Sequence, residues 1–211
     1  MSILHESLPD TFEERIETAN LVLRPYQEGD ESDFMRLLQE NSSILTPAFG
    51  GRLARVRVLD DARTQVKQLR TEWDNRKVFD FGVWSKHSNE YIGDIALKNL
   101  DRRVPKAELG LYFTNWPETK ELAIEALQAI LRFAFQTINL NKVYLRCTAS
   151  NLYYGELVED FGFMKEGIIR SDYRGVDSEE LLDLSYYGMT REDYEQKQQQ
   201  REEQTNSTAM A

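Results

Sequence analysis

The residues best placed for chemistry are the first residues of a helix that directly follows a strand. Residues 107–113 (AELGLYF) alternate with period two, residues 122–134 follow helical spacing, and Pro117 marks the change between them. Amides at a helix N-terminus have no partner inside the helix, and they lie at the positive end of its dipole. The turn could therefore bind an anion such as a phosphate. An ordinary strand-to-helix turn, which offers the same amides, is the competing interpretation.

Composition argues against several other kinds of site. The only histidines are His5 and His87, and Cys147 is the only cysteine, so neither a metal site nor an internal disulfide is expected. We expect Cys147 to be a buried thiol in an apolar strand. The net charge of −10 argues against a nucleic-acid partner. It would suit cationic partners such as amines, although acidic residues also serve solubility alone.

No stretch has the pattern of a membrane-spanning helix or of a basic secretory leader, so we expect no membrane partner and a cytoplasmic location. A chain of 211 residues is long enough for one substantial core. We expect a leader over residues 1–16, one domain over 17–193, and a polar tail over 194–211 without regular structure.

The periodicity predicts an alternation of strands and helices. Strands are expected at 17–25, 78–85, 91–100, 107–113, 142–149, 163–173 and 181–189. Helices are expected to start at Asp30, at Asp60 or Asp61, near Pro117 and at Asn151. The strand at 107–113 is expected to be half buried, and residues 43–59, which contain Pro47, Gly50 and Gly51, are expected to form a loop. This order predicts an α+β fold with helices on both faces of a mixed, mostly antiparallel sheet.

Several stretches, in their order and spacing, resemble the GNAT N-acetyltransferases, and in particular the RimJ/RimL branch that acetylates protein N-termini and related amines. The resemblance covers nearly all of residues 17–193. It rests on TANLVLRP at 18–25, AELGLYF at 107–113, LAIEAL at 122–127, ASN at 149–151, GF at 162–163, EG at 166–167, and Asp183 and Met189 in the closing strand. It implies a GNAT-like sheet in which one parallel strand pair is splayed apart.

The resemblance implies acetyl transfer from acetyl-CoA to an amine without a metal. The pantetheine arm would lie between the splayed strands, held by main-chain groups of Leu111, Tyr112 and Phe113. Gly110 would allow close approach of backbone and ligand, or would mark a plain bulge. The pyrophosphate would bind at the start of the long helix, formed by Thr119, Lys120, Glu121, Leu122 and Ala123.

This turn departs from the family pattern. The family places Gln or Arg, two residues, Gly, one residue, and then Gly or Ala, whereas residues 118–123 read ETKELA and only Ala123 agrees. Glu118 and Glu121 bring negative charge to a phosphate site, which lowers affinity unless the side chains turn outward to water. Both acids would also stabilise the helix start, and Lys120 would restore part of the attraction.

The resemblance points to Glu108 as the base, directly or through water, because family members commonly place a carboxylate on this strand. Alternatively, Glu108 pairs with Lys98 or Arg102 across the sheet. The family's Asn-x-x-Ser is here Asn151-Leu152-Tyr153-Tyr154, so Tyr154 would donate to the leaving thiolate. Tyr153 is the alternative donor. Asn151 would contact the cofactor arm or simply cap its helix.

By analogy with the family, residues 43–59, the helix near Trp73 and the hairpin loop at 174–180 would surround the acceptor. Acids of this hairpin would attract a cationic amine or would merely be solvated: Asp172, Asp177 and Glu179. The favoured function is an N-acetyltransferase for a peptide α-amine or a small primary amine, with direct attack in a ternary complex. The alternative is a catalytically silent GNAT-fold binding or regulatory protein with a decayed acetyl-CoA site. A homodimer is the default oligomer.

Overall fold

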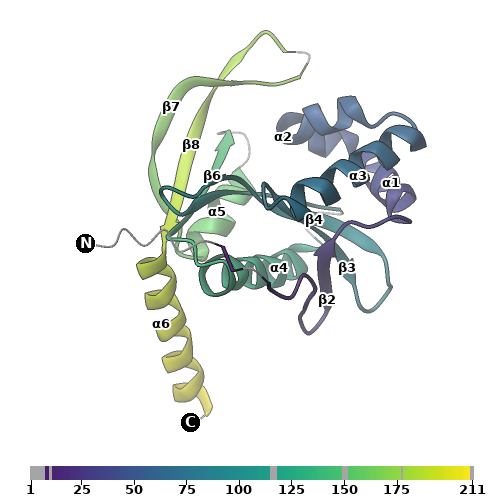
Figure 1. The fold of residues 1–211 in the computed structure, drawn as a ribbon. Helices are drawn as coiled ribbons and strands as arrows, with labels where there is room; N and C mark the ends of the chain where they lie inside the picture. The colour runs from purple at the N-terminus through teal and green to yellow at the C-terminus, as the bar shows by residue number, and fades with distance from the viewer. Residues whose placement is uncertain (1–7, 10, 115–117, 149–151, 177, 210–211) are drawn as a thin grey trace.

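The computed structural model describes residues 8–9, 11–114, 118–148, 152–176 and 178–209 (Figure 1). Its central feature is an eight-stranded sheet in the order β1-β2-β3-β4-β5-β6-β8-β7. Neighbouring strands pair antiparallel, except that β5 and β6 pair parallel. This topology confirms the expected mixed, mostly antiparallel sheet with one parallel pair.

The strands are β1 (Ile16–Glu17), β2 (Leu21–Pro25), β3 (Phe79–Ser85), β4 (Tyr91–Asp101), β5 (Lys106–Phe113), β6 (Lys142–Thr148), β7 (Met164–Arg174) and β8 (Leu181–Thr190). The helices are α1 (Glu31–Glu40), α2 (Ser42–Arg55), α3 (Leu59–Asp74), α4 (Lys120–Arg132), α5 (Leu152–Asp160) and α6 (Arg191–Ala209). A π-helical segment, η1 (Phe133–Thr137), continues α4. Figure 1 shows α1, α2 and α3 on one side of the sheet and α4 and α5 on the other.

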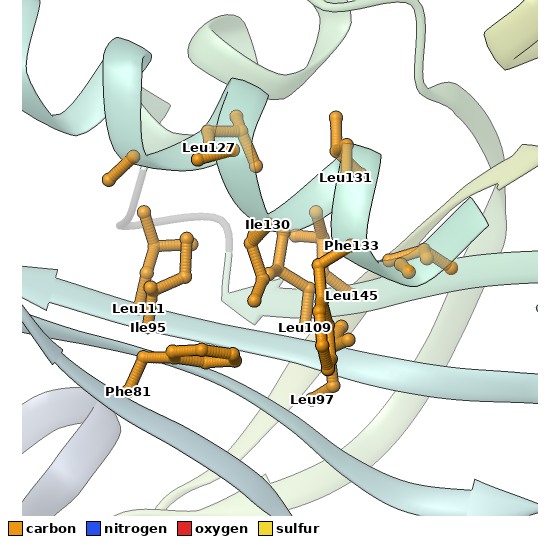
Figure 2. Close-up of a cluster of buried hydrophobic side chains, with 14 of the residues drawn as sticks. Phe81, Ile95, Leu97, Leu109, Leu111, Leu127, Ile130, Leu131, Phe133 and Leu145 are labelled. Carbon is orange, nitrogen blue, oxygen red and sulfur yellow. The ribbon is translucent and has the colours of Figure 1, made fainter. Parts of the chain in front are cut away.

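An apolar core fills the space between α4 and the sheet (Figure 2). Alternate residues of four neighbouring strands point to this face, because side chains along a strand alternate between its two sides. They meet the apolar stripe of α4, which recurs at helical spacing. The labelled members of this core are all buried: Phe81, Ile95, Leu97, Leu109, Leu111, Leu127, Ile130, Leu131, Phe133 and Leu145.

The other face of β5 is also buried, which corrects the expectation of a half-buried strand. Glu108 is 4% exposed and Tyr112 is 1% exposed, although both lie on the side opposite Leu109. A second apolar cluster, contributed largely by α1, α2 and α3, covers this face around Tyr112. The polar side chains of β5 are buried because they find charged or hydroxyl partners on that face, as described below.

Residues 43–59 are mostly helical rather than a loop. They lie largely within α2, whose backbone leaves helical geometry at Phe49 (φ −123°, ψ 17°). The proline and glycines that predicted a loop thus lie around a kink, where one helical segment ends and the next begins. The helix expected to start at Asp60 or Asp61 is α3, which starts at Leu59 and has Asn75 as its C-cap.

The described parts of the leader and of the tail have defined structure. In the leader, the Phe12 ring packs edge-on against Trp73, Phe79 and Phe133, and β1 pairs with β2. In the tail, α6 extends to Ala209 and projects away from the body in Figure 1, which corrects the expectation of no regular structure. Its Glu, Gln, Lys and Arg residues are good helix formers even without an apolar face. The limits of the domain at 17 and 193 stay a prediction.

Candidate active site

The parallel pair β5–β6 opens part of the way along its length. The strands pair at Lys106–Lys142, Ala107–Val143 and Glu108–Tyr144. Beyond Glu108, the described residues of β5 pair with β4 alone, and those of β6 pair with β8 alone. The backbone edge of β5 from Leu109 to Phe113 is therefore available to an extended group, which it can bind as it would bind an added strand. This edge includes Leu111, Tyr112 and Phe113, whose expected role in holding the pantetheine arm stays a prediction.

The start of α4 presents amides that have no partner within the described part of the chain. Thr119 is the N-cap, and its Oγ1 donates to the Thr114 carbonyl at 2.6 Å. The Ala123 amide donates to the Thr119 carbonyl at 2.8 Å, so it is already used. The amides of Lys120, Glu121 and Leu122 remain, and no side-chain cap occupies them.

The acidic side chains of this turn point to solvent. Glu118, Lys120 and Glu121 are all exposed, and neither carboxylate caps the helix. The arrangement fits a diphosphate, because the free amides lie at the positive end of α4 while the two carboxylates can stay in water. Glu121 lies in the first turn of α4, so its charge would oppose an anion bound at the helix start, and water screens this repulsion in part.

Glu108 lies where β5 and β6 begin to separate, and it is surrounded by donors. Asn99 Nδ2 donates to its Oε2 at 2.8 Å, and Arg146 Nη2 approaches its two oxygens at 3.0 and 3.2 Å. Lys98 Nζ is 3.5 Å from Oε1, so the expected cross-strand pair with Lys98 is present. Arg102 instead donates to the carbonyl of Arg76 at 3.4 Å. We name Glu108, Arg146, Lys98 and Asn99 the glutamate cluster.

Gly110 lies next along the same face of β5. It pairs in regular register with Ala96, and the irregularity of this strand pair lies between Lys98 and Asp101, so the bulge interpretation of Gly110 is wrong. A Cβ at Gly110 would lie 3.5 Å from Lys98 Cε, which is ordinary contact. Ala96 and Gly110 therefore form a stretch of small residues beside the open edge of β5.

A second group of charges lies at the other end of this stretch. Arg52 of α2 reaches down to the sheet, where Nη2 is 2.7 Å from Asp80 Oδ2 and Nη1 is 3.0 Å from Asp94 Oδ2. Asp80 comes from β3 and Asp94 from β4, and their side chains are 3% and 2% exposed. Asp94 pairs across the strands with Tyr112. We name Arg52, Asp80 and Asp94 the aspartate cluster.

Three buried phenols join the aspartate cluster. Tyr26 OH donates to Asp94 Oδ2, Tyr26 and Tyr91 hydroxyls are 2.7 Å apart, and Tyr91 and Tyr112 hydroxyls are 3.3 Å apart. Burial, followed by the charge of Asp94, raises the pKa of Tyr26 and of Tyr112. Both therefore remain protonated donors. The pKa of Asp94 is raised as well, first by burial and then by the neighbouring Asp80 carboxylate, with Arg52 opposing the shift.

The side of the site away from the sheet is formed by α2 and the β7–β8 hairpin. Gly50 packs so closely against Val176 that a Cβ at position 50 would lie 2.9 Å from Val176 Cγ2. The Phe49 ring lies 4.9 Å from that of Tyr112. The Trp73 side chain is 2% exposed and packs on Phe81 in the core, and the expected role of the helix near it in surrounding the acceptor stays a prediction.

The remaining predicted residues are only partly described. Tyr154 belongs to α5, but its side chain is outside the described part of the chain, as are Asn151 and Asp177. Asp172 accepts from Tyr186 OH at 3.1 Å, and Glu179 is exposed. The described residues contain no group of three metal-ligating side chains. Among the same residues, no helix is both long and apolar enough to cross a membrane.

The sequence analysis did not single out the aspartate cluster or Arg146. The sequence did contain a signal for the two aspartates, because Asp80 interrupts the apolar run VFDFGVW and Asp94 interrupts the apolar run YIGDIAL. A charged residue within a buried strand is almost always paired or functional. Arg52 carried no such signal, because it lay in a stretch expected to be a loop.

Comparison with known proteins identifies the family. The model of the acetyltransferase (GNAT) domain matches residues 20–164, which is well over half of the chain. An uncharacterized N-acetyltransferase p20 from Bacillus licheniformis is 26% identical over 114 residues, which are 54% of this chain and 63% of that protein. The probable N-acetyltransferase YjcK from Bacillus subtilis (strain 168) is 21% identical over 155 residues, covering 73% of this chain and 86% of that protein.

Solved structures share the fold. A probable acetyltransferase superposes with a TM-score of 0.76 at 22% identity, over 85% of this chain and 98% of the other. RimL, a ribosomal L7/L12 alpha-N-protein acetyltransferase in complex with coenzyme A, gives a TM-score of 0.75 at 15% identity, over 84% of this chain and 98% of that one. At these identities the likeness establishes fold alone. The matched family model, the splayed parallel pair and the amides at the start of α4 agree, and the chain belongs to the GNAT acetyltransferase family.

Proposed function

We propose that this protein is an acetyl-CoA-dependent N-acetyltransferase that acts on a primary amine, either a peptide α-amine or a small molecule. The observation that carries the proposal is the end of β5–β6 pairing after Glu108, which leaves a backbone edge from Leu109 to Phe113. That strand leads through the turn at Thr119 to the free amides of α4. An extended arm ending in a diphosphate needs these two features side by side.

Acetyl-CoA would supply the activated acyl group as a thioester. The chain itself would hold the extended arm along β5 and the diphosphate at Lys120, Glu121 and Leu122. The small residues Ala96 and Gly110 leave room for an acceptor on the face that α2 and the hairpin cover. Binding both reactants together in this way lowers the entropic cost of their reaction.

Glu108 remains our candidate for the base, and the contacts suggest that it acts through water. Its oxygens already accept from Asn99 and Arg146, and Lys98 is the most distant donor at 3.5 Å. A water that replaces Lys98 beside Oε1 would link an acceptor amine to the carboxylate. Tyr154, or alternatively Tyr153, is proposed to donate to the departing thiolate, and Asn151 to contact the arm or cap α5.

The alternative of a silent binding protein draws support from one observation. Two exposed carboxylates, Glu118 and Glu121, stand at the turn that would hold the diphosphate. Calorimetric titration with acetyl-CoA separates the two functions. We expect binding in the micromolar range, together with amine-dependent release of free thiol. The absence of heat and of thermal stabilisation at millimolar acetyl-CoA would overturn the enzymatic proposal in favour of the silent protein.

Replacing Glu108 with Gln tests the base. We expect turnover to fall about 10²-fold or more, as for loss of a general base, while the dissociation constant of acetyl-CoA stays within about twofold. Arg146→Ala is the matched variant, because it loosens the glutamate cluster without removing the carboxylate. If Glu108→Gln and Arg146→Ala lower turnover equally, Glu108 serves to hold Arg146 and is not the base.

Replacing Glu121 with Gln tests the acidic turn. The change removes one negative charge near the diphosphate, so we expect acetyl-CoA to bind about three- to tenfold more tightly, corresponding to about 1 kcal/mol. Stability should fall slightly, because an acid in the first turn favours the helix dipole by about 0.3–1 kcal/mol. Glu192→Gln is the control, since Glu192 is an exposed acid in the first turn of α6. Weaker acetyl-CoA binding by Glu121→Gln would contradict the electrostatic account.

A further inference from the structure

A row of polar side chains crosses five neighbouring strands of the sheet, which stand in the order β4-β5-β6-β8-β7. Each strand contributes one side chain, and each side chain is hydrogen-bonded to the next. We name these residues the polar row: Asn99, Glu108, Arg146, Tyr186 and Asp172. The row thus connects the candidate base to the β7–β8 hairpin.

The middle of the row follows from the strand register. Glu108 lies opposite Tyr144 in the last pair that the described residues of β5 and β6 form, and Arg146 is two residues further along β6. Residues two apart on a strand point to the same face, so Glu108 and Arg146 project to one side where the strands separate. Arg146 in turn lies directly opposite Tyr186 of β8. The Glu108–Arg146 contact therefore spans the start of the opening between β5 and β6.

Arg146 contacts Glu108 at two points. Its Nε is 3.3 Å from Oε1, and its Nη2 is 3.0 Å from Oε2. A two-point contact of this kind fixes the plane of a carboxylate, which a single donor cannot do. The guanidinium also donates to the hydroxyl of Tyr186, and that hydroxyl donates to Asp172 Oδ2 at 3.1 Å. Tyr186 thus holds Arg146 from the side opposite Glu108.

Both ends of the row lie where a strand is irregular. Asn99 has a φ of 52° and lies in the register shift of β4 against β5, and Asp172 follows Ser171, which has a φ of 54° in the register shift of β7 against β8. In a regular strand Asn99 would point away from the face that Lys98 shares with Glu108. Bulges redirect side chains in this way, and a positive φ is unfavourable for serine. The two irregularities therefore direct Asn99 and Asp172 into the row.

The orientation of Glu108 matters for the chemistry that we assign to it. A carboxylate accepts a proton, directly or from a water, best along one of its lone pairs. Asn99 and Arg146 hold its two oxygens from fixed directions, while Lys98, at 3.5 Å, leaves one approach to Oε1 less occupied. Without Arg146, the Glu108 side chain could rotate at the place where β5 loses its neighbour.

The far end of the row belongs to the hairpin that covers the site. Val176 of this hairpin packs on Gly50 of α2, and Figure 1 shows the hairpin extending beyond the rest of the sheet. Asp172 is exposed, and exposed polar contacts contribute little to the stability of a fold. Orientation of Glu108 explains a continuous row from Asp172 to a buried carboxylate better than stability does.

We propose that Arg146 and Tyr186 are positioning residues for the base. Arg146 orients the Glu108 carboxylate across the opening between β5 and β6, Tyr186 holds Arg146 there, and Asp172 anchors Tyr186 from the hairpin. Glu108 therefore has its working orientation only while the hairpin is in place. This inference rests on the proposed function, because it concerns how Glu108 serves that reaction.

Tyr186→Phe tests the row with the loss of a single hydroxyl. The acceptor is the tripeptide Ala-Ala-Ala or n-butylamine, whichever the wild type acetylates faster. We expect kcat to fall about three- to tenfold, while KM for the amine and the dissociation constant of acetyl-CoA stay within about twofold. In a Glu108→Gln background the same change should have no further effect, because Tyr186 acts through that carboxylate. An unchanged kcat, or losses that multiply in the double variant, would overturn the proposal.

Two changes at Asp172 provide a second test. Asp172→Ala removes the acceptor for Tyr186 and should lower kcat about two- to fivefold, whereas Asp172→Asn keeps an acceptor oxygen and should retain most of the activity. Attraction of a cationic amine by Asp172 would instead raise KM, and to the same extent in both variants. Glu180→Ala, an exposed acid on the same hairpin, is the control and should leave kcat unchanged. Equal kcat values for Asp172→Ala and Asp172→Asn would contradict the anchoring role.

A spectroscopic measurement separates this inference from the proposed function. The NMR signal of the Arg146 Nε proton, assigned by its loss in Arg146→Lys, reports how firmly the guanidinium is held. Its exchange with water should become at least about threefold faster in Tyr186→Phe. Absence of any turnover by the wild type would sink the proposed function, and this exchange rate would still decide whether Tyr186 holds Arg146. Unchanged exchange would overturn the inference and leave the enzymatic proposal intact.

Discussion

The two acid clusters on one face of the sheet solve the burial of a carboxylate in different ways. Glu108 has donors at both of its oxygens, from Asn99, Arg146 and Lys98. The aspartate cluster has fewer, with one guanidinium for two carboxylates and one oxygen left unpaired. Both oxygens of Glu108 therefore have donors, whereas the aspartate cluster is short of one donor, at Asp80 Oδ1, within the described part of the chain.

The largest expected effect comes from removing the central cation of each cluster. Arg52→Ala leaves two buried carboxylates without a cation and should lower the free energy of unfolding by about 3–5 kcal/mol. Arg146→Ala leaves Glu108 with Lys98 and Asn99 and should cost about 1–2 kcal/mol. Urea denaturation measures both, with Arg36→Ala as an exposed control expected to cost about 0.5 kcal/mol. Equal losses for Arg52→Ala and Arg146→Ala would remove the distinction between the clusters.

The next largest effect is expected in the pH dependence of the unfolding free energy, through the titration of Asp94. Its pKa is raised in the folded protein by burial and by Asp80. The folded state thus holds this proton to a higher pH than the unfolded chain, whose aspartates titrate at about 3.9. The stability that Asp94 contributes is present below that value and is lost as the pH rises through the folded pKa. Asp94→Asn should flatten the decline in unfolding free energy above about pH 4.

Unfolding free energies from pH 4 to pH 8 measure this effect. Asp33→Asn serves as the control, because Asp33 is half exposed on α1, and its curve should run parallel to that of the wild type. Parallel curves for Asp94→Asn and the wild type would show that Asp94 titrates alike in the folded and unfolded chains. In that case the aspartate cluster would not be short of a donor.

The smallest effect is the response to salt. Arg146 is 34% exposed and Lys98 is 41% exposed, so water and ions reach the glutamate cluster. The screening length falls from about 10 Å at 0.1 M salt to about 3 Å at 1 M. The Glu108–Arg146 coupling from a double-mutant cycle should therefore fall with salt by a few tenths of a kcal/mol. The Asp94–Arg52 coupling should change less, and a larger fall there would reverse the comparison.

The sequence predicted the fold well because its signals were local. Alternation marked β3, β4 and β5, and the change to helical spacing placed α4 within a few residues of its observed start at Lys120. The stretch with Gly50 and Gly51 was wrongly predicted to be a loop. Glycines favour loops, but they also allow a kink within a helix, as they do in α2.

Of the candidate site, only the features that depend on the backbone could be anticipated from the sequence. The free amides of α4 and the edge of β5 follow from strand and helix order. The aspartate cluster depends on a contact between Arg52 and strands β3 and β4, which lie 28 and 42 residues further along the chain. No local pattern encodes such a contact, because it arises from how α2 packs on the finished sheet.

The sheet consists of two parts, which we call panels: strands β1–β5, and strands β6, β8 and β7. Among the described residues, strands β1–β5 meet strands β6, β8 and β7 through the three residue pairs from Lys106–Lys142 to Glu108–Tyr144. A coenzyme lying between the panels would replace the absent hydrogen bonds between β5 and β6 and so hold the two panels together. Its binding should make the two panels unfold together, so the protein's mechanical integrity and its readiness for reaction would depend on the same molecule.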